Sequence, residues 1–277
     1  MTAPHPDLVA ELLDIAERAA RTAVELVGDH RPATLELDTK SSDTDMVTQM
    51  DRAAEAAIRA VISESRPGDV VMGEEMGDGA GPQVDDAARE QVVWWVDPID
   101  GTTNYVYDHP GWNVSIAAAI GGTVVAAVVA DPTHGRTYTA TLGGGARCSD
   151  RPGPLAVEQP PTLDQALVAT GFDYVAERRH RQGLVVAELL PRERDIRRMG
   201  AAALDLCSVA AGRVDAYYEA CLSTWDFAAG ALIATEAGAR VGGLDGGPAR
   251  PGSVMAAHPV LFDQLVVVLS ALGGCDL

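Results

Sequence analysis

The chain has 277 residues, of which 47% are hydrophobic, so it can bury one large core or two modest ones. Its formal net charge of −19 argues against a nucleic-acid partner, because contacts to a phosphate backbone need clustered Lys and Arg. We therefore expect an anionic small molecule to be held locally, by metal ions, rather than by the field of the whole protein.

The sequence gives no signal for export or membrane insertion. The acidic, Pro-bearing start MTAPHPD does not resemble a signal peptide, and the longest apolar run, 116–130, is too short to span a bilayer. The four cysteines lack a CxxC spacing, which is typical of idle thiols in a reducing compartment. We expect a soluble, cytoplasmic protein without a membrane partner.

The first part of the chain predicts two helices followed by a largely antiparallel sheet. The expected elements are helix 8–27, strand 34–37, loop 40–45, helix 47–61, strand 69–73, strand 92–96 and strands 112–120, 123–130 and 136–142. Gly28 would end the first helix, and Thr44 or Asp45 would cap the second. Gly121-Gly122 is the signal of a two-residue hairpin.

The stretch WWVDPIDGTTNY, at 94–105, carries the clearest chemistry. The β-formers that lead into it predict a buried strand that ends where the acids begin. Pro98 fixes its own φ and holds Asp97 extended while the chain turns into Asp100, so the two carboxylates can converge. Gly101 leaves room for an approaching group, and the amides after it resemble a helix start, which suits an anion.

Two carboxylates can share a site with a phosphate only if hard divalent ions neutralise them. Ligands that are all oxygen favour magnesium or a similar ion. Glu74, which follows strand 69–73, would add a third carboxylate if that strand neighbours strand 92–96. The pattern therefore predicts a metal site at one sheet edge.

Four other residues are candidates for the functional site, although each also has a simpler explanation. Asp51 lies on the inward face of the second helix, but it could also be a solvated helix acid. Asp226 lies in the first turn of a helix, where capping alone would explain it. Glu219 could be a rim acid or a substrate contact. Lys40 is the only lysine among 21 basic residues, which suggests a function, although chance survival would also explain it.

The proline-rich segment 151–161 is the candidate boundary between an N-terminal half, 1–150, and a C-terminal half, 151–277. After it, strands and helices alternate, which predicts an α/β layer. The expected elements are strand 166–170, helix 176–190, strand 195–198, helix 201–211, strand 214–219, helix 225–237, strands 239–241 and 253–256, and helix 259–272.

Four motifs in this order resemble the inositol monophosphatases, a family of magnesium-dependent, lithium-sensitive phosphomonoesterases in the superfamily of fructose 1,6-bisphosphatase. The motifs are KSSDTDMVTQMD at 40–51, GEE at 73–75, DPIDGTTNY at 97–105 and WDFAAGALIATEAGA at 225–239. The resemblance implies a layered αβαβα sandwich, α+β in its N-terminal half and α/β in its C-terminal half. It also implies a homodimer with its active site between the halves.

The resemblance further implies a role for each matching residue. Two or three Mg²⁺ ions would be held by Glu74, Asp97, the Ile99 carbonyl, Asp100 and Asp226. The catalytic group would comprise Glu74, Thr102, Asp51 and Lys40, with Thr102 and Asp51 orienting the attacking water. The phosphate and the polyol would be bound by Asp100, Gly101, Thr102, Ala202, Glu219 and Asp226.

Two departures from the family pattern put the substrate in doubt. Ala201 stands where most relatives have Ser or Thr, and the segment GGGARCSD lacks the usual aromatic residue and Asn-Gly. Inositol 1-phosphate or a related polyol phosphate is the first expectation. The alternatives are 3′-phosphoadenosine 5′-phosphate, histidinol phosphate and fructose 1,6-bisphosphate, or a regulatory binding protein that kept the fold without the activity. An aspartate-nucleophile phosphatase is disfavoured, because its acids lie two apart rather than three.

Overall fold

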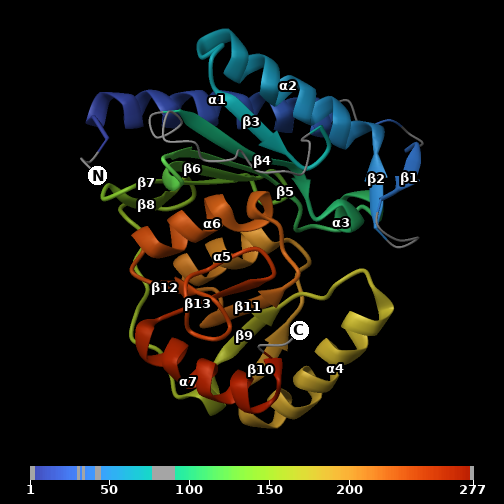
Figure 1. The fold of residues 1–277 in the computed structure, drawn as a ribbon, viewed down its shortest axis with the longest axis vertical. Coiled ribbons are helices and arrows are strands. Elements are labelled where there is room, and N and C mark those ends of the chain that lie inside the picture. Colours follow the sequence, from blue (N-terminus) through green and yellow to red (C-terminus); the bar gives the residue numbers. More distant parts are fainter. Residues whose placement is uncertain (1–3, 30–31, 33–34, 41–44, 77–90, 275–277) are drawn as a thin grey trace.

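The computed structural model describes residues 4–29, 32, 35–40, 45–76 and 91–274, which form alternating layers of helices and sheets (Figure 1). Helices α1 and α2 cover the outer face of one sheet, α5 and α6 lie between the two sheets, and α4 and α7 lie outside the second sheet. The expected αβαβα sandwich is confirmed. The longer helices are α1 (Pro6–Asp29), α2 (Gln49–Ser65), α4 (Ala176–Leu189), α5 (Ala202–Ala210), α6 (Thr224–Glu236) and α7 (Pro259–Ala271).

The first sheet has six strands in the spatial order β3-β4-β5-β6-β7-β8. Its strands are β3 (Val70–Gly73), β4 (Val92–Asp100), β5 (Asn113–Ile120), β6 (Thr123–Asp131), β7 (Arg136–Thr141) and β8 (Gly145–Cys148). Only the β3–β4 pairing is parallel, so the sheet is mostly antiparallel, as predicted. The predicted hairpin joins β5 to β6 through Gly121 and Gly122, which both have positive φ.

The second sheet has five strands in the order β10-β9-β11-β13-β12. Its strands are β9 (Leu167–Thr170), β10 (Asp195–Arg197), β11 (Ala216–Ala220), β12 (Arg240–Gly242) and β13 (Ser253–Ala257). Strand β9 runs parallel to both β10 and β11, so the carboxyl ends of these three strands meet at one edge of the sheet. Side chains just beyond that edge are the ones that an α/β layer presents to a ligand.

The sequence did not predict the short strand that precedes α2, and it placed the helix cap too early. β2 (Met46–Thr48) pairs with β1 (Leu37–Thr39), whereas the sequence predicted a strand at 34–37 and none at 46–48. Because β2 holds these residues extended, α2 begins at Gln49 and is capped by Thr48, not by Asp45 or Thr44. Thr44 and the rest of 41–44 lie outside the described residues.

The sequence predicted that this strand ends at Val96, but β4 continues to Asp100. Its pairing with β5 shifts register. Asp97 lies opposite Ser115 and Asp100 opposite Asn113, so four residues of β4 match three residues of β5. In a regular strand, residues three apart face opposite sides. The extra residue of this bulge brings the side chains of Asp97 and Asp100 to the same face of the sheet.

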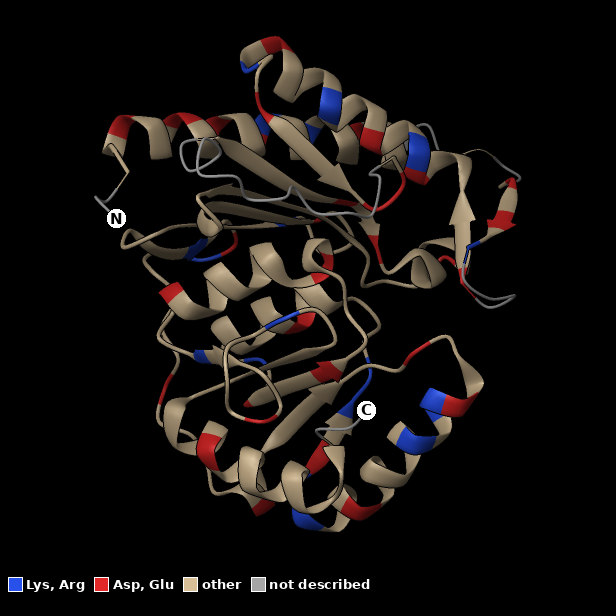
Figure 2. Ribbon diagram, viewed as in Figure 1, with Lys and Arg blue, Asp and Glu red and all other residues tan. Residues whose placement is uncertain are grey.

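Acidic residues are spread over most elements, whereas α4 carries arginines near its N-terminal end (Figure 2). Cys148, Cys207 and Cys221 are unpaired thiols, and Cys275 lies outside the described residues. Among the described residues, no helix is long and apolar enough to cross a membrane.

Candidate active site

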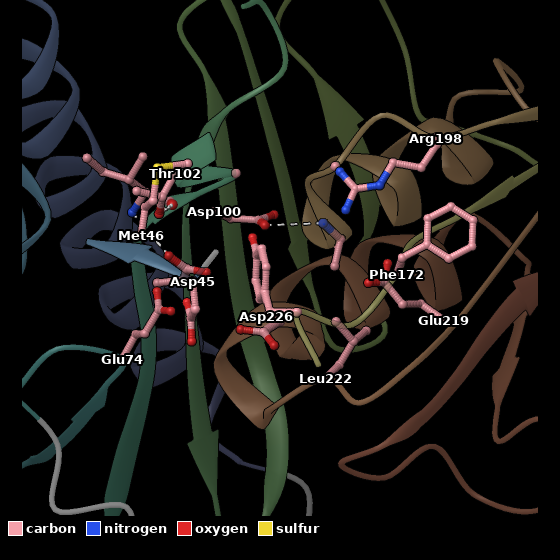
Figure 3. A pocket seen from close by; sticks show the side chains of 16 residues that line it. Asp45, Met46, Glu74, Asp100, Thr102, Phe172, Arg198, Glu219, Leu222 and Asp226 are labelled. Carbon is pink, nitrogen blue, oxygen red and sulfur yellow. Dashed lines mark hydrogen bonds between the residues drawn. The ribbon is translucent and has the colours of Figure 1, made fainter. Parts of the chain in front are cut away.

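An acid-lined pocket lies between the two sheets, where both sheets and the central helices meet (Figure 3). It is lined by nine of the residues that the sequence marked as site candidates: Glu74, Asp97, Ile99, Asp100, Gly101, Thr102, Ala202, Glu219 and Asp226. The two other candidates contact this group: Asp51 accepts a hydrogen bond from Thr102, and Lys40 pairs with Glu74. The structure thus brings every predicted site residue together.

Glu74 reaches the pocket because β3 runs parallel to β4. The pairing of Gly73 with Val96 places the next residue of each strand, Glu74 and Asp97, side by side. The amide of Glu74 continues the ladder by donating to the Val96 carbonyl at 3.2 Å. The predicted gathering of acids at one sheet edge is confirmed for these strands.

Asp100 is fixed by donors from both halves of the molecule. Its carboxylate accepts hydrogen bonds from Asn113 Nδ2 at 2.8 Å, from the Ala203 amide at 2.9 Å and from the Ala202 amide at 3.2 Å. Burial raises the pKa of Asp100 to about 6, and these donors oppose the rise. The Ala202 amide, expected to contact a polyol, is therefore already engaged by Asp100.

Asp51 and Asp226 hold equivalent places in two helices, in the first turn after the capping residue. The Asp51 carboxylate accepts from the Thr48 amide at 2.8 Å and from the Thr48 hydroxyl at 2.6 Å. The Asp226 carboxylate accepts from the Ser223 amide at 2.7 Å. One oxygen of each acid is thus fixed by its own helix start. The second oxygen of Asp51 accepts from Thr102 Oγ1 at 3.1 Å.

Lys40 and Thr102 complete the polar contacts around these acids. Lys40 Nζ lies 2.8 Å from Glu74 Oε1 and also contacts the Glu75 carboxylate. Burial opposes the charge of Lys40, but the two glutamates outweigh it and raise the lysine pKa above its ordinary value. Thr102 Oγ1 also lies 3.0 Å from the Ile99 carbonyl oxygen.

The pocket is short of positive charge. Burial raises the pKa of Asp97 well above its usual range, and the nearby carboxylates of Glu74 and Asp100 raise it further. Burial and Glu74 act on Asp226 in the same way. Buried oxygen ligands that repel one another fit a hard divalent cation such as Mg²⁺, which would relieve both the burial cost and the repulsion.

The metal assignment nevertheless stays a prediction. Within the described ranges, no three acidic, histidine or cysteine side chains form a ready-made metal-binding group. The ammonium group of Lys40 lies 2.8 Å from Glu74 Oε1, an oxygen that the family resemblance assigns to a metal ion.

Sequence reasoning missed several residues that line the other wall, among them Phe172, Tyr174, Arg198 and Leu222. Phe172 and Arg198 follow strands β9 and β10, whose carboxyl ends lie at the same edge. A search of the residues just beyond these parallel strands would have found both. The predicted Glu219, in β11, accepts a hydrogen bond from Tyr217 Oη at 2.8 Å.

The combination of this layered fold with an acid-lined pocket between the sheets defines a class of phosphatases. An inositol monophosphatase from Anabaena (Nostoc) sp. PCC 7120 superimposes with a TM-score of 0.80 at 30% identity, over 95% of this chain and 97% of that one. The inositol-1-monophosphatase SuhB of Mycobacterium tuberculosis strain H37Rv is 41% identical over 100% of this chain and 99% of its own length. The Nus factor SuhB of Escherichia coli K12 is 40% identical over 90% and 91%.

The sequence matches the inositol monophosphatase family over residues 8–271. The chain belongs to this family, as the motifs predicted. Its similarity to inositol monophosphatases supports phosphatase activity.

Proposed function

We propose that this protein is a Mg²⁺-dependent phosphomonoesterase that hydrolyses inositol 1-phosphate, or a related polyol phosphate, to the free alcohol and inorganic phosphate. One observation carries the proposal: carboxylates from β4, from α6 and from the turn after β3 line a single pocket beside the Thr102–Asp51 hydrogen bond. Glu74, Asp97, the Ile99 carbonyl, Asp100 and Asp226 are proposed to hold two or three Mg²⁺ ions. Bound magnesium would neutralise the phosphate and lower the pKa of a water molecule.

The protein's own groups would position the reactants. Asp51 is held by Thr48 and faces Thr102, so these two side chains can orient a water molecule and accept its proton. The amides of Gly101 and Thr102 are proposed to bind the phosphate. Gly101 has φ of +91°, and a Cβ there would come within 3.0 Å of the Gly111 carbonyl oxygen, so only glycine suits this turn.

The polyol would lie against the wall formed by the second sheet. Glu219 and Asp226 line that side of the pocket, and their carboxylates can accept hydrogen bonds from hydroxyl groups. Burial raises the pKa of Glu219 to about 7, while the Tyr217 hydroxyl and the Arg198 guanidinium favour its charged form. Ala201 supplies no hydroxyl here, which makes inositol 1-phosphate the first substrate to test rather than the only one.

The test is phosphate release with Mg²⁺ from inositol 1-phosphate, 3′-phosphoadenosine 5′-phosphate, histidinol phosphate and fructose 1,6-bisphosphate, each with and without Li⁺. We expect Asp97→Asn to lower kcat by about a hundredfold or more, because this acid lies among the proposed metal ligands and next to Glu74. The variant should stay folded, since it removes a charge that burial disfavours. Asp14→Asn, on the exposed face of α1, is the matched control. Normal turnover by Asp97→Asn would remove the basis of the assignment.

A second candidate is a regulatory binding protein that retains the fold. It is favoured by the name of the Escherichia coli relative, a Nus factor, and not by any feature of the pocket. Absence of turnover on all four esters, from a folded protein supplied with Mg²⁺, would favour this second role. Lithium-sensitive turnover of any of them would support the phosphatase.

A further inference from the structure

A second groove adjoins the catalytic pocket on the side of α4. It shares Met46, Tyr174 and Arg198 with that pocket and adds Tyr107, His109 and Arg179; we call these six residues the arginine groove. The groove has a volume of about 490 Å³, so a phosphate group with part of its hydration shell fits inside it. The three shared side chains make the groove the direct neighbour of the catalytic pocket.

Two arginines of the groove differ from their neighbours in sequence, because they form no ion pair with a described residue. Their neighbours in sequence are paired, Arg178 with Asp173 at 3.1 Å and Arg197 with Asp195 at 2.7 Å. Within the described part of the chain, neither Arg179 nor Arg198 forms an ion pair. The charge of Arg198 also acts on Glu219, which lines the catalytic pocket. In a protein with a net charge of −19, two guanidinium groups that form no ion pair with a described residue still favour an anion in this groove.

The side chain of Arg198 occupies space that is open because residue 200 is a glycine. Its guanidinium group packs against Gly200, where any Cβ would collide with it, and Gly200 has φ of +89°. In Figure 3 the side chain of Arg198 turns toward the interior of the pocket rather than away from it. Arg179 approaches from α4, whose N-terminal end carries the arginines visible in Figure 2.

The groove differs from the catalytic pocket in the balance of its charged groups. The catalytic pocket is lined mainly by carboxylates, which need metal ions before they can accept a phosphate. The groove shares Arg198 and Tyr174 with that pocket and adds Arg179 and Tyr107, and guanidinium and phenol groups bind a phosphate directly. Arginine binds phosphate through paired N–H groups, and an imidazole such as His109 can add a further donor.

We propose that the arginine groove binds a second phosphate of the substrate, so that the enzyme prefers a sugar or polyol bisphosphate to the matching monophosphate. The inference rests on the proposed function for the ester that is cleaved. The first phosphate lies in the acid-lined pocket and is released by water, while the second stays attached to the sugar and is held by Arg179 and Arg198. The groove then selects the substrate without taking part in the chemical step.

The test compares glucose 1-phosphate with glucose 1,6-bisphosphate, which differ by one phosphate, on the full-length protein with Mg²⁺. Wild type should show the higher kcat/KM on the bisphosphate. Arg179→Ala should lower that value by roughly three- to tenfold through KM, as expected for an exposed charge-assisted contact, and leave glucose 1-phosphate unaffected. Arg181→Ala is the matched control, because it removes the same charge from the same helix outside the groove.

The possible failures are distinguishable. Equal kcat/KM on both esters, or an equal loss on both in Arg179→Ala, would contradict the binding of a second phosphate in the groove. The proposed phosphatase activity would stand. If neither ester is cleaved, calorimetric binding of glucose 1,6-bisphosphate decides, and equal affinity in wild type and Arg179→Ala would also overturn the groove. A change in oligomeric state of Arg179→Ala in sedimentation, without a change in selectivity, would show a contact between copies of the chain instead.

Discussion

Glu193 is a buried carboxyl group, 7% exposed, and neither of its oxygens has a hydrogen-bond partner among the described residues. Burial raises its pKa from 4.5 to about 7, and the nearby charge of Asp195 adds to the rise. The folded protein therefore binds this proton more tightly than the unfolded chain. The free energy of unfolding falls as the pH rises through the interval from 4.5 to about 7, and the full penalty remains above it.

We expect Glu193→Gln to raise the thermal midpoint by about 2 °C at pH 8 and to change it little at pH 5, because the amide removes the charge but not the shape. Differential scanning calorimetry at the two pH values measures this difference. Glu188→Gln, an exposed position on α4, should leave the midpoint unchanged at both. An equal effect of Glu193→Gln at pH 5 and pH 8 would contradict the role of its charge.

The N-terminus of α2 connects two parts of the site. Asp51 faces Thr102, and one turn later the fully buried Glu55 accepts hydrogen bonds from the amides of Glu75, at 2.7 Å, and Met76, at 3.2 Å. Glu55 thereby holds the turn that presents Glu74. Gly73 is required there because a Cβ at this position would overlap the Glu55 carboxylate.

Gly73→Ala should therefore destabilise the protein by about 1–3 kcal/mol through overpacking and should also displace Glu74. We expect weaker Mg²⁺ binding in calorimetry, beyond what the loss of stability explains at a temperature where the variant is folded. Gly28→Ala is the control, since nothing lies within 4 Å of a Cβ at that position of α1. Unchanged Mg²⁺ affinity in Gly73→Ala would show that the turn can move without disturbing Glu74.

The elements that hold the site were largely predictable, because their acids lie at the ends of strong strand and helix patterns. The strands before Glu74 and Asp97 and the helical position of Asp226 followed from periodicity and capping signals, whereas the pairing of β3 with β4 entered only as a condition. The bulge at Asp97 and Asp100 was not predictable, because it depends on pairing with β5, which single-strand patterns do not contain. Arg198 was missed because the search was limited to acidic residues and motif positions and did not include the residues just beyond the parallel strands of the second sheet.

At the scale of the whole molecule, the site lies where helix starts from different layers converge. The first turns of α3 (Thr102–Val106), α5 and α6 all contribute residues to the pocket, and their partial positive charge favours carboxylates there. Asp97 comes from the first sheet, whereas Asp226 comes from the helix layer beneath it. A divalent cation bound between these acids would join the two layers as well as neutralise them.

This arrangement predicts a specific stabilisation by Mg²⁺. At about 100 times its dissociation constant, a ligand adds about 2.7 kcal/mol to the free energy of unfolding, which for a chain of this size raises the thermal midpoint by roughly 5–10 °C. NaCl at equal ionic strength should give a much smaller rise, because screening acts on the whole surface charge and not on the pocket. In Asp226→Asn the Mg²⁺-specific part should disappear, whereas Asp14→Asn should keep it. If Asp226→Asn retained the full shift, the cation would have to bind elsewhere, and the two layers would be joined by their apolar packing and by direct hydrogen bonds such as those from the Ala202 and Ala203 amides to Asp100.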